Sequence, residues 1–392
     1  MPDIKTEVMT VNMGPQHPST HGVLRLVLEL DGETVLSAAP TIGYLHTGIE
    51  KTTEQKKWQQ VIPLVERMDY LSAQSNSMSF CLSVEKLLGI EIPERVRNIR
   101  VLLAELQRIN SHLVWLGTHG MEVGAVSVML YCFRERELLL NINELLAGFR
   151  LFPSYMRIGG LREDLPRGFH AAVIAFLDRF GPKLDEYEDL LTKNEIYLKR
   201  TQNVGVISKD KAIAYGLLGP IGRAAGVDYD VRKYFPYLGY ETYDFSVPTQ
   251  TNGDVYSRYL VRVAEMRQST RIIKQCVAEM PAGSHIASDR KFVPPPRAEM
   301  KRSMEALIHH FKLYTEGFHV PAGETYTAVE SPKGEFGVFL VADGTNRPYR
   351  CKIRSPSFAH LQSMDYLSRG HMLADSVAIL GSMDIVFGEI DR

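Results

Sequence analysis

Two histidines in a short, turn-rich segment are the residues of this sequence best suited to chemistry. They are His17 and His21, in the segment Gly14-Pro-Gln-His-Pro-Ser-Thr-His-Gly22. A histidine ring takes up and releases a proton near neutral pH, and loops held by a rigid sheet often carry binding residues. Hydrogen bonding of both rings to the loop backbone is the alternative interpretation. Zinc binding is disfavoured, because Pro18 and the strand that follows argue against the helix on which histidines at this spacing would share a face.

A larger set of polar residues lies in segments expected to be loops or helix ends around an apolar helical bundle. Its members are His17, His21, His46, Glu50, Asp69, Tyr70, His119 and Glu122. Such a set suits a largely apolar ligand with few polar atoms, where donors orient the ligand and a carboxylate fixes the tautomer and charge of a histidine. Nucleotide-binding and acyl-transfer enzymes are disfavoured, because the sequence has no Gly-x-Gly-x-x-Gly, Walker or Gly-x-Ser-x-Gly motif in the required context.

The residues after the histidine loop predict the strand that holds it. Leucines at positions 24, 26, 28 and 30 fall on one face of an extended chain. Asp31-Gly32 then predicts a tight hairpin turn into a second strand over residues 34–38.

Helices are expected through most of the middle of the chain. Their predicted ranges are 50–60, 64–88, 93–117, 126–146, 254–280 and 297–314, in which apolar residues recur at helical spacing or a proline marks the start. The glycine-rich segment 118–124 is expected to join two of these helices and to hold Glu122 in a loop.

Near the carboxyl end, apolar residues recur at every second position, which is the spacing of a strand. Strands are predicted over 326–331, 335–342 and 349–354, followed by a short helix near 372–380. We therefore expect an α+β fold, in which a mainly helical bundle core carries an N-terminal antiparallel sheet and a C-terminal antiparallel meander. The expected regions are 1–50, 51–320 and 321–392, integrated into one domain.

Composition disfavours several functional classes. The 45 basic and 46 acidic residues give a net charge of -1 without a dense basic stripe, so nucleic-acid binding has little support. The longest apolar runs fall far short of the ~20 residues that cross a bilayer, and we expect no secretory signal or transit peptide. The four cysteines, at positions 81, 132, 276 and 351, are expected to be buried apolar residues, because none is close enough in sequence to another to form a metal-ligand pair.

Several blocks of residues are typical of one family. They include Gly14-Pro-Gln-His-Pro-Ser-Thr-His-Gly22, Gly43-Tyr-Leu-His-Thr-Gly-Ile-Glu-Lys51, Arg67-Met-Asp-Tyr70, Arg157-Ile-Gly-Gly160, Pro332-Lys-Gly-Glu-Phe-Gly337 and Asp384-Ile-Val-Phe-Gly-Glu-Ile-Asp-Arg392. In these blocks, and in register over nearly its whole length, the chain resembles the quinone-site subunits of NADH-quinone oxidoreductase, respiratory complex I.

The resemblance implies a respiratory-chain oxidoreductase that is active only as a complex. This chain would form the quinone-reduction site with an adjacent subunit that carries a tetranuclear iron-sulfur cluster. Electrons would come from NADH through FMN and further clusters in other subunits, and quinone reduction would drive proton translocation in membrane-arm subunits. The chain itself would bind no cofactor or metal. It would contact other peripheral-arm subunits and lie on the cytoplasmic side of the bacterial plasma membrane.

The family is also similar to the large subunit of nickel-iron hydrogenases, whose metal is held by two Cys-x-x-Cys pairs. The corresponding stretches of this chain, 68–71 and 382–385, contain no cysteine. Without thiolates a nickel-iron centre cannot be held there. The resemblance places the quinone headgroup in the vacated cavity.

Residue roles follow from the resemblance position by position. Tyr70 resembles the tyrosine that hydrogen-bonds one quinone carbonyl, and His21 resembles the histidine that reaches the other, with His17 in the same quinone-binding loop. Glu122 stands where many relatives have an aspartate that pairs with this histidine, so it is expected to hold the same charge on a longer side chain.

Two positions depart from the family pattern. Thr47 stands where mitochondrial relatives have an arginine, and Phe152 stands where many relatives have a histidine beside the terminal cluster. Phe152 therefore predicts a weaker pH dependence of the potential of that cluster. Two other interpretations stay open: a silent, hydrogenase-like scaffold that only holds the cluster-bearing subunit, and a stand-alone metal hydrolase. A scaffold would not need both donors, His21 and Tyr70, which favours the quinone site.

Overall fold

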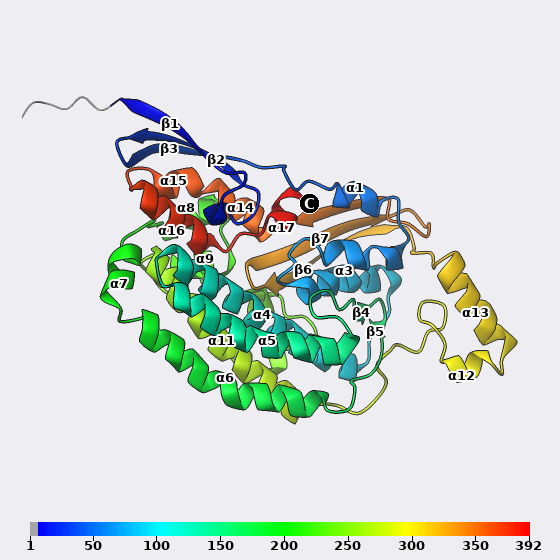
Figure 1. The fold of residues 1–392 in the computed structure, drawn as a ribbon. Coiled ribbons are helices and arrows are strands. Elements are labelled where there is room, and N and C mark those ends of the chain that lie inside the picture. Colours follow the sequence, from blue (N-terminus) through cyan, green and yellow to red (C-terminus); the bar gives the residue numbers. More distant parts are fainter. Residues whose placement is uncertain (1–6) are drawn as a thin grey trace, which may run out of the picture.

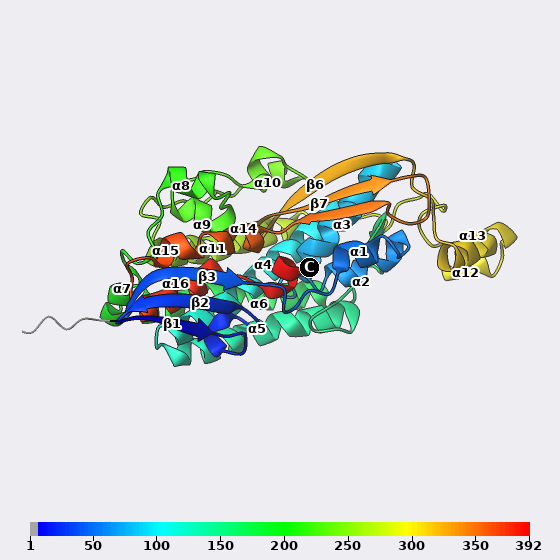
Figure 2. The same ribbon diagram turned by 90° about the horizontal axis from the view of Figure 1, so that it is seen from above.

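Long helices form the centre of the computed structural model, which describes residues 7–392. The N-terminal sheet lies with the C-terminal helices over one end of this bundle, and a second sheet lies over the other end (Figures 1 and 2). The sheets have three antiparallel strands each, in the orders β1-β2-β3 and β6-β7-β8. The predicted α+β class is therefore confirmed.

The central helices are α4 (Glu94–Glu122), α5 (Val126–Ala147), α6 (Phe169–Leu191) and α11 (Val255–Ala278). The predictions for α5 and α11 are confirmed to within a few residues. The prediction that α4 ends at Gly117 is wrong. Gly117 and Gly120 lie inside the helix, where a side chain would crowd the backbone of Met129 and the side chain of Val128 on α5. Glu122 is therefore the last residue of α4, one turn beyond the expected end.

The prediction of one helix over 64–88 is also wrong. The structure has a single turn, α2 (Ile62–Val65), and then α3 (Ala73–Leu88), with a non-helical segment at 66–72 between them. The side chain of Asn76 holds this break, because its amide nitrogen donates to the carbonyls of Val65 at 3.1 Å and Asp69 at 3.2 Å. The break carries Asp69 and Tyr70.

Two further predicted helices are interrupted. The range 50–60 contains α1 (Ile49–Thr53) and a 3-10 turn, η2 (Trp58–Gln60), because the chain turns inward to bury the indole of Trp58. The range 297–314 contains α12 (Arg297–Met300) and α13 (Met304–Thr315), and the hydroxyl of Ser303 caps the second of them. The α12–α13 segment projects from the body of the molecule (Figure 1).

The N-terminal sheet contains β1 (Val8–Met13), β2 (Arg25–Asp31) and β3 (Thr34–Thr41). The predicted leucine face is confirmed, since the leucines at 24, 26, 28 and 30 are all buried. The exposed edge strand β1 was not predicted. The 3-10 turn η1 (Pro18–Thr20) lies in the loop between β1 and β2 and carries the two histidines at its ends.

The predicted meander is confirmed as β6 (Gly323–Ser331), β7 (Gly334–Ala342) and β8 (Arg350–Arg354). After it come α14 (Pro356–Gln362), α15 (Met364–Ser368), α16 (Leu373–Met383) and α17 (Phe387–Asp391), of which only α16 was predicted. Apolar side chains of α16 and α17 pack with the leucines of β2 in one core cluster, so the two ends of the chain fold together.

The remaining elements connect these layers. They are the short hairpin β4 (Met156–Arg157) and β5 (Gly160–Leu161), the helices α7 (Glu195–Thr201), α8 (Lys209–Ala214), α9 (Gly219–Ala224) and α10 (Val231–Tyr234), and the 3-10 turn η3 (Tyr240–Thr242).

Candidate functional site

His21 faces the end of α4. Its ring Nε2 lies 3.0 Å from Oε1 of Glu122, and the two side chains are only 14% and 5% exposed. The backbone of His21 is left-handed, with φ 49° and ψ 36°, where the chain leaves η1. Non-glycine residues adopt this conformation rarely, and such residues are frequent at functional sites. The turn therefore aims the imidazole at the carboxylate.

The pair favours a protonated histidine. Burial by itself lowers the pKa of His21, but the contact with Glu122 and the negative charges of Glu122 and Asp384 raise the pKa above its ordinary value overall. A negative charge in direct contact favours the charged form of a histidine. Glu122 therefore stabilises the charged form of the His21 ring.

Gly381 on α16 provides the space that Glu122 occupies. A side chain at position 381 would overlap Oε2 of Glu122 and lie 3.2 Å from Nδ1 of His119. The indole of Trp115 donates to the carbonyl of Gly381 at 2.8 Å and stacks on the ring of His119. Burial and nearby positive charges lower the pKa of His119 to about 3, so this second imidazole is neutral.

Tyr70 lies beside a second group of charges. The preceding residue, Asp69, is fully buried, and its Oδ2 lies 3.0 Å from Nζ of Lys333. Lys333 also contacts Oδ1 of Asp384 at 3.8 Å. The Tyr70 side chain is 37% exposed, and partial burial together with the charge of Asp69 raises the pKa of its phenol. Tyr70 therefore keeps its proton at neutral pH.

The same two charges act on both candidate donors. Lys333 lowers the pKa of both His21 and Tyr70, and Asp384 raises both. Asp384 has a left-handed backbone, with φ 52°, at the end of α16. The structure therefore gathers the N-terminal loop, the break at 66–72 and the end of α16 around one set of buried charges.

Three of the sequence-predicted residues have other partners. His17 is exposed and accepts a hydrogen bond from the backbone N–H of Ser19 at 3.2 Å, capping η1. The ring of His46 contacts the carbonyl of Asp391 at 2.7 Å, and Glu50 accepts from the backbone N–H of Ile353 at 2.8 Å. The contacts of His46 and Glu50 hold their loops to the C-terminal part of the chain, whereas the contact of His17 lies within its own turn.

Sequence reasoning missed Lys333. It was part of a Pro-Lys-Gly turn between two predicted strands, and nothing in that pattern indicates that its side chain is buried. Lys333 and Asp384 each stand in a block typical of the family, and Asp384 also lies in the cysteine-free stretch 382–385, but neither was named as a site residue. The sequence offered only a weak signal for a buried lysine, namely a charged residue in a turn between strongly apolar strands.

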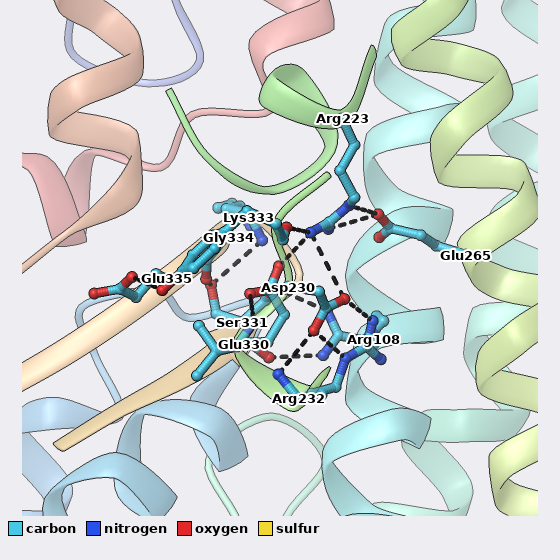
Figure 3. A network of polar contacts seen from close by, with 12 residues as sticks. Arg108, Arg223, Asp230, Arg232, Glu265, Glu330, Ser331, Lys333, Gly334 and Glu335 are labelled. Carbon is cyan, nitrogen blue, oxygen red and sulfur yellow. Dashed lines mark hydrogen bonds and ion pairs between the residues drawn. The ribbon is translucent and has the colours of Figure 1, made fainter. Parts of the chain in front are cut away.

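A larger buried network lies behind Lys333 (Figure 3). Arg223 pairs with Glu265 at 2.7 Å and with Glu330 at 2.8 Å, while Arg232 pairs with Asp230 at 2.6 Å. These side chains are at most 2% exposed. Buried ion pairs with this many partners hold their elements rigidly, because breaking one leaves an uncompensated charge. The network therefore forms a rigid support for the turn that carries Lys333.

The two positions that depart from the family pattern differ in their contacts. The Phe152 ring lies 4.9 Å from the guanidinium carbon of Arg67, a cation–π contact, whereas Thr47 is exposed.

All four cysteines are buried and free, as predicted. In the part of the chain that the structure describes, no group of three or more His, Cys, Asp or Glu side chains is placed to hold a metal ion. No helix over residues 7–392 has the length and apolar character needed to span a membrane.

Two surface clefts lie away from these residues. One, of about 600 Å³, is lined by side chains that include Arg157, Phe292 and Phe318, and another, of about 850 Å³, by side chains that include Tyr237 and Tyr326. Neither is lined by His21 or Tyr70. Titratable groups, rather than cavity size, therefore identify the candidate site.

Comparison with known proteins agrees with the resemblance in sequence. Residues 122–392 match the family model described as "Respiratory-chain NADH dehydrogenase, 49 Kd subunit". The chain is 57% identical to a D subunit of NADH-quinone oxidoreductase from Roseiflexus sp. over 98% of its own length and 93% of that protein. It is 53% identical to the D subunit of NADH-quinone oxidoreductase from Wolbachia pipientis over the full length of both chains. This chain therefore belongs to the family of the 49 kDa subunit of respiratory-chain NADH dehydrogenase and is a subunit of an oxidoreductase complex.

Proposed function

We propose that this chain forms the quinone-reduction site of a proton-pumping NADH:quinone oxidoreductase, together with an adjacent iron-sulfur subunit. The observation that carries the proposal is the arrangement of two proton donors of different strength around one group of buried charges. The donors are His21, paired with Glu122 at 3.0 Å, and Tyr70, whose neighbour Asp69 contacts Lys333 at 3.0 Å.

The chemistry of quinone reduction fits two such donors. A quinone becomes a quinol by taking up two electrons and two protons, one proton at each carbonyl oxygen. Donors placed where negative charge develops lower the barrier to this step. In the proposal His21 and Tyr70 each hydrogen-bond one oxygen, and Glu122 stabilises the imidazolium before it gives up its proton. The raised pKa of Tyr70 means that its phenol releases a proton only after charge has built up on the quinone.

The proposal includes the descent from a hydrogenase-like ancestor. The two cysteine-free stretches, 68–71 and 382–385, hold Asp69 and Asp384, and the Lys333 ammonium contacts both carboxylates. In place of a metal with thiolate ligands, this position has a buried lysine between two acidic groups. A quinone headgroup beside it would meet hydrogen-bond donors and a positive charge, which suits an acceptor of electrons.

The proposal also names the source of the electrons, the partner subunits and the place of proton translocation. The electrons come from a tetranuclear cluster in the adjacent subunit, which receives them from NADH through FMN and further clusters elsewhere in the complex. The subunit lies at the cytoplasmic face of the membrane, where it meets other peripheral-arm subunits and the membrane arm. Proton translocation takes place in that membrane arm.

The test is the replacement Tyr70→Phe in the assembled complex. We expect the rate of quinone reduction to fall, while electron transfer from NADH to an artificial acceptor stays at the level of the unmodified enzyme. Tyr349→Phe is the matched control, because it removes an exposed phenol that lies just before β8. A photoreactive quinone analogue should label peptides that contain His21 or Tyr70.

The scaffold alternative predicts a different outcome. A subunit that only holds its cluster-bearing partner would show equal quinone reduction before and after Tyr70→Phe, and the quinone analogue would label other subunits. That pair of results would replace the quinone site with the scaffold role.

A further inference from the structure

We propose that Arg108 is a positioning residue for quinone reduction: its guanidinium fixes the turn between β6 and β7 and thereby holds the Lys333 ammonium between Asp69 and Asp384. This inference rests on the proposed quinone site and adds to it a residue that touches neither donor. Arg108 lies on α4 and is fully buried.

The guanidinium binds the turn through its backbone (Figure 3). Nη1 of Arg108 donates to the carbonyl of Ser331 at 2.9 Å, and Nη2 donates to the carbonyl of Glu330 at 2.6 Å. Its Nε donates to Oε2 of Glu105 at 3.1 Å. A planar fork that donates in three fixed directions defines both the position and the orientation of the backbone it binds.

The turn is closed tightly between Arg108 and Lys333. The hydroxyl of Ser331 donates to the carbonyl of Gly334 at 2.8 Å and accepts from the backbone N–H of Lys333 at 3.3 Å. On its outer side the turn lies against the start of α9, where a side chain on Gly219 would come within 2.5 Å of the Lys333 carbonyl. The turn therefore has little freedom to shift while Arg108 holds it.

The same helix that carries Arg108 also receives the lysine side chain. Nζ of Lys333 lies 3.2 Å from the hydroxyl of Ser111, which stands one turn after Arg108 on α4. One face of α4 thus holds the backbone of the turn at one point and the ammonium at the next. The carboxylates of Asp69 and Asp384 complete the surroundings of the ammonium from the break at 66–72 and from the end of α16.

The support of Arg108 is itself fixed. Oε1 of Glu105 accepts from the hydroxyl of Tyr240 at 2.7 Å and from Arg232 at 3.1 Å, and Oε2 accepts from the hydroxyl of Ser269 at 2.6 Å. Opposing burial, the charges of Arg108 and Arg232 lower the pKa of Glu105 to about 2, so the carboxylate stays ionised. Arg108 therefore has a constant counter-charge at any working pH.

The position of the ammonium matters because both donors respond to it. Lys333 lowers the pKa of Tyr70 and of His21, whereas Asp384 raises both. Glu389 on α17 also acts on the ammonium, and Glu122 and His119 on α4 are the other titratable groups near His21. If the turn moves and the ammonium withdraws, Tyr70 becomes a weaker acid and His21 stays protonated to higher pH.

The experiment compares Arg108→Lys with Arg100→Lys in the assembled complex. Arg100 is a matched control, because it is a fully buried arginine on α4 that binds the carboxylate of Glu85 and the carbonyls of Arg157 and Gly160. It holds the β4–β5 hairpin and not the Lys333 turn. In both variants the positive charge stays, and the fork that binds two carbonyls is lost.

We expect Arg108→Lys to lower kcat for quinone reduction by up to about 100-fold, the cost of a misplacement of about 1 Å at a reacting centre. The alkaline limb of the pH profile should move to higher pH, and KM should change little. Electron transfer to an artificial acceptor should stay unchanged. Arg100→Lys should leave the shape of the pH profile as it is in the unmodified enzyme. Equal pH profiles in the two variants would overturn the proposal and assign Arg108 to the fold alone.

A milder variant covers the case in which Arg108→Lys does not assemble. Ser269→Ala removes one hydrogen bond to Glu105 and so loosens the support of Arg108 without touching the turn. We expect the same shift of the pH profile, smaller in size, and an unshifted profile would contradict the proposal. Failure of the quinone site itself looks different, because the unmodified complex would then leave His21 and Tyr70 peptides unlabelled by the quinone analogue.

Discussion

Replacing Glu122 by glutamine isolates the charge that acts on His21. The amide has the shape of the carboxylate but no negative charge, so the contact at 3.0 Å becomes a neutral one. Both side chains are nearly buried, and solvent and salt therefore screen the lost charge weakly. Glu122→Gln should leave the fold intact and change the protonation of His21.

The size of the effect follows from the strength of the contact. An opposite charge in contact with a titratable group shifts its pKa by at least about one unit, so the imidazolium loses at least about 1.4 kcal/mol of stabilisation. Because about 1.4 kcal/mol corresponds to a factor of ten, we expect quinone reduction to fall at least about tenfold where protonated His21 limits the rate.

Glu122→Gln should shift the pH profile of quinone reduction in a defined direction. Contact with Glu122 raises the pKa of His21, whereas burial lowers it. Without the carboxylate the imidazolium loses its proton at lower pH, so the alkaline limb of the activity profile should move to lower pH. This is opposite to the shift expected for Arg108→Lys, which makes the two effects separable.

The assay measures NADH:quinone reductase activity from about pH 5 to pH 9, which includes the range of about pH 5 to pH 8 over which an unperturbed histidine titrates. Electron transfer to an artificial acceptor is measured alongside as the control for assembly. Glu122→Asp keeps the charge on a shorter side chain and should give a smaller shift in the same direction. If Glu122→Gln has the pH profile of the unmodified enzyme, the pair does not set the protonation of His21 and the reasoning is refuted.

Two further predictions use the same complex. Gly381→Ala should reproduce the activity loss of Glu122→Gln, because the added methyl group overlaps the Glu122 carboxylate. Alanine by itself favours a helix over glycine by about 1 kcal/mol, so a loss of activity would not come from a weaker α16. Unaltered activity in this variant would contradict the packing argument. Phe152→His should make the potential of the terminal cluster pH-dependent, with a slope of up to about 59 mV per pH unit for one proton coupled to one electron, whereas the unmodified enzyme should show a flatter dependence. Redox titration at several pH values measures this slope, and a steep slope with Phe152 in place would count against the prediction.

Regular elements of this fold were predictable because their apolar period continues without interruption. The leucines of β2 alternate strictly, and the apolar stripe of α11 repeats at helical spacing along Val255–Ala278, so local pattern and tertiary packing agree. The three strands of the C-terminal meander were predicted for the same reason. Positions of this kind need no information from distant parts of the chain.

The break at 66–72 was missed because the apolar spacing runs through it. The helix is interrupted by polar contacts that no local pattern contains, among them the side chain of Asn76 on two carbonyls and the Lys333 ammonium on Asp69. The end of α4 was misplaced for a related reason. Glycine is frequent where helices end, but here Gly117 lies where α4 packs against α5. Tertiary contacts therefore decided the places where the candidate site lies.

The family resemblance singled out His17, His21, Tyr70 and Glu122, whereas residue patterns alone gave eight candidates. Three of these, His17, His46 and Glu50, hold backbone in the structure. Lys333 could not be predicted as a member of the group, because its partners Asp69 and Asp384 lie far from it in sequence. A buried charge is recognisable only when its counter-charges are known.

In the proposed quinone site, the balance of buried charge gives a physical reason for His21 to regain a proton that it has given up. With His21 protonated, its charge is compensated by Glu122 at 3.0 Å. When the proton leaves, Glu122 is a buried carboxylate that has lost its only ion pair within residues 7–392, since His119 beside it is neutral. An uncompensated buried charge is unstable by several kcal/mol, so the pair draws in a proton from outside. Each quinone reduced would thus be followed by proton uptake at this pair, before the next quinone is reduced.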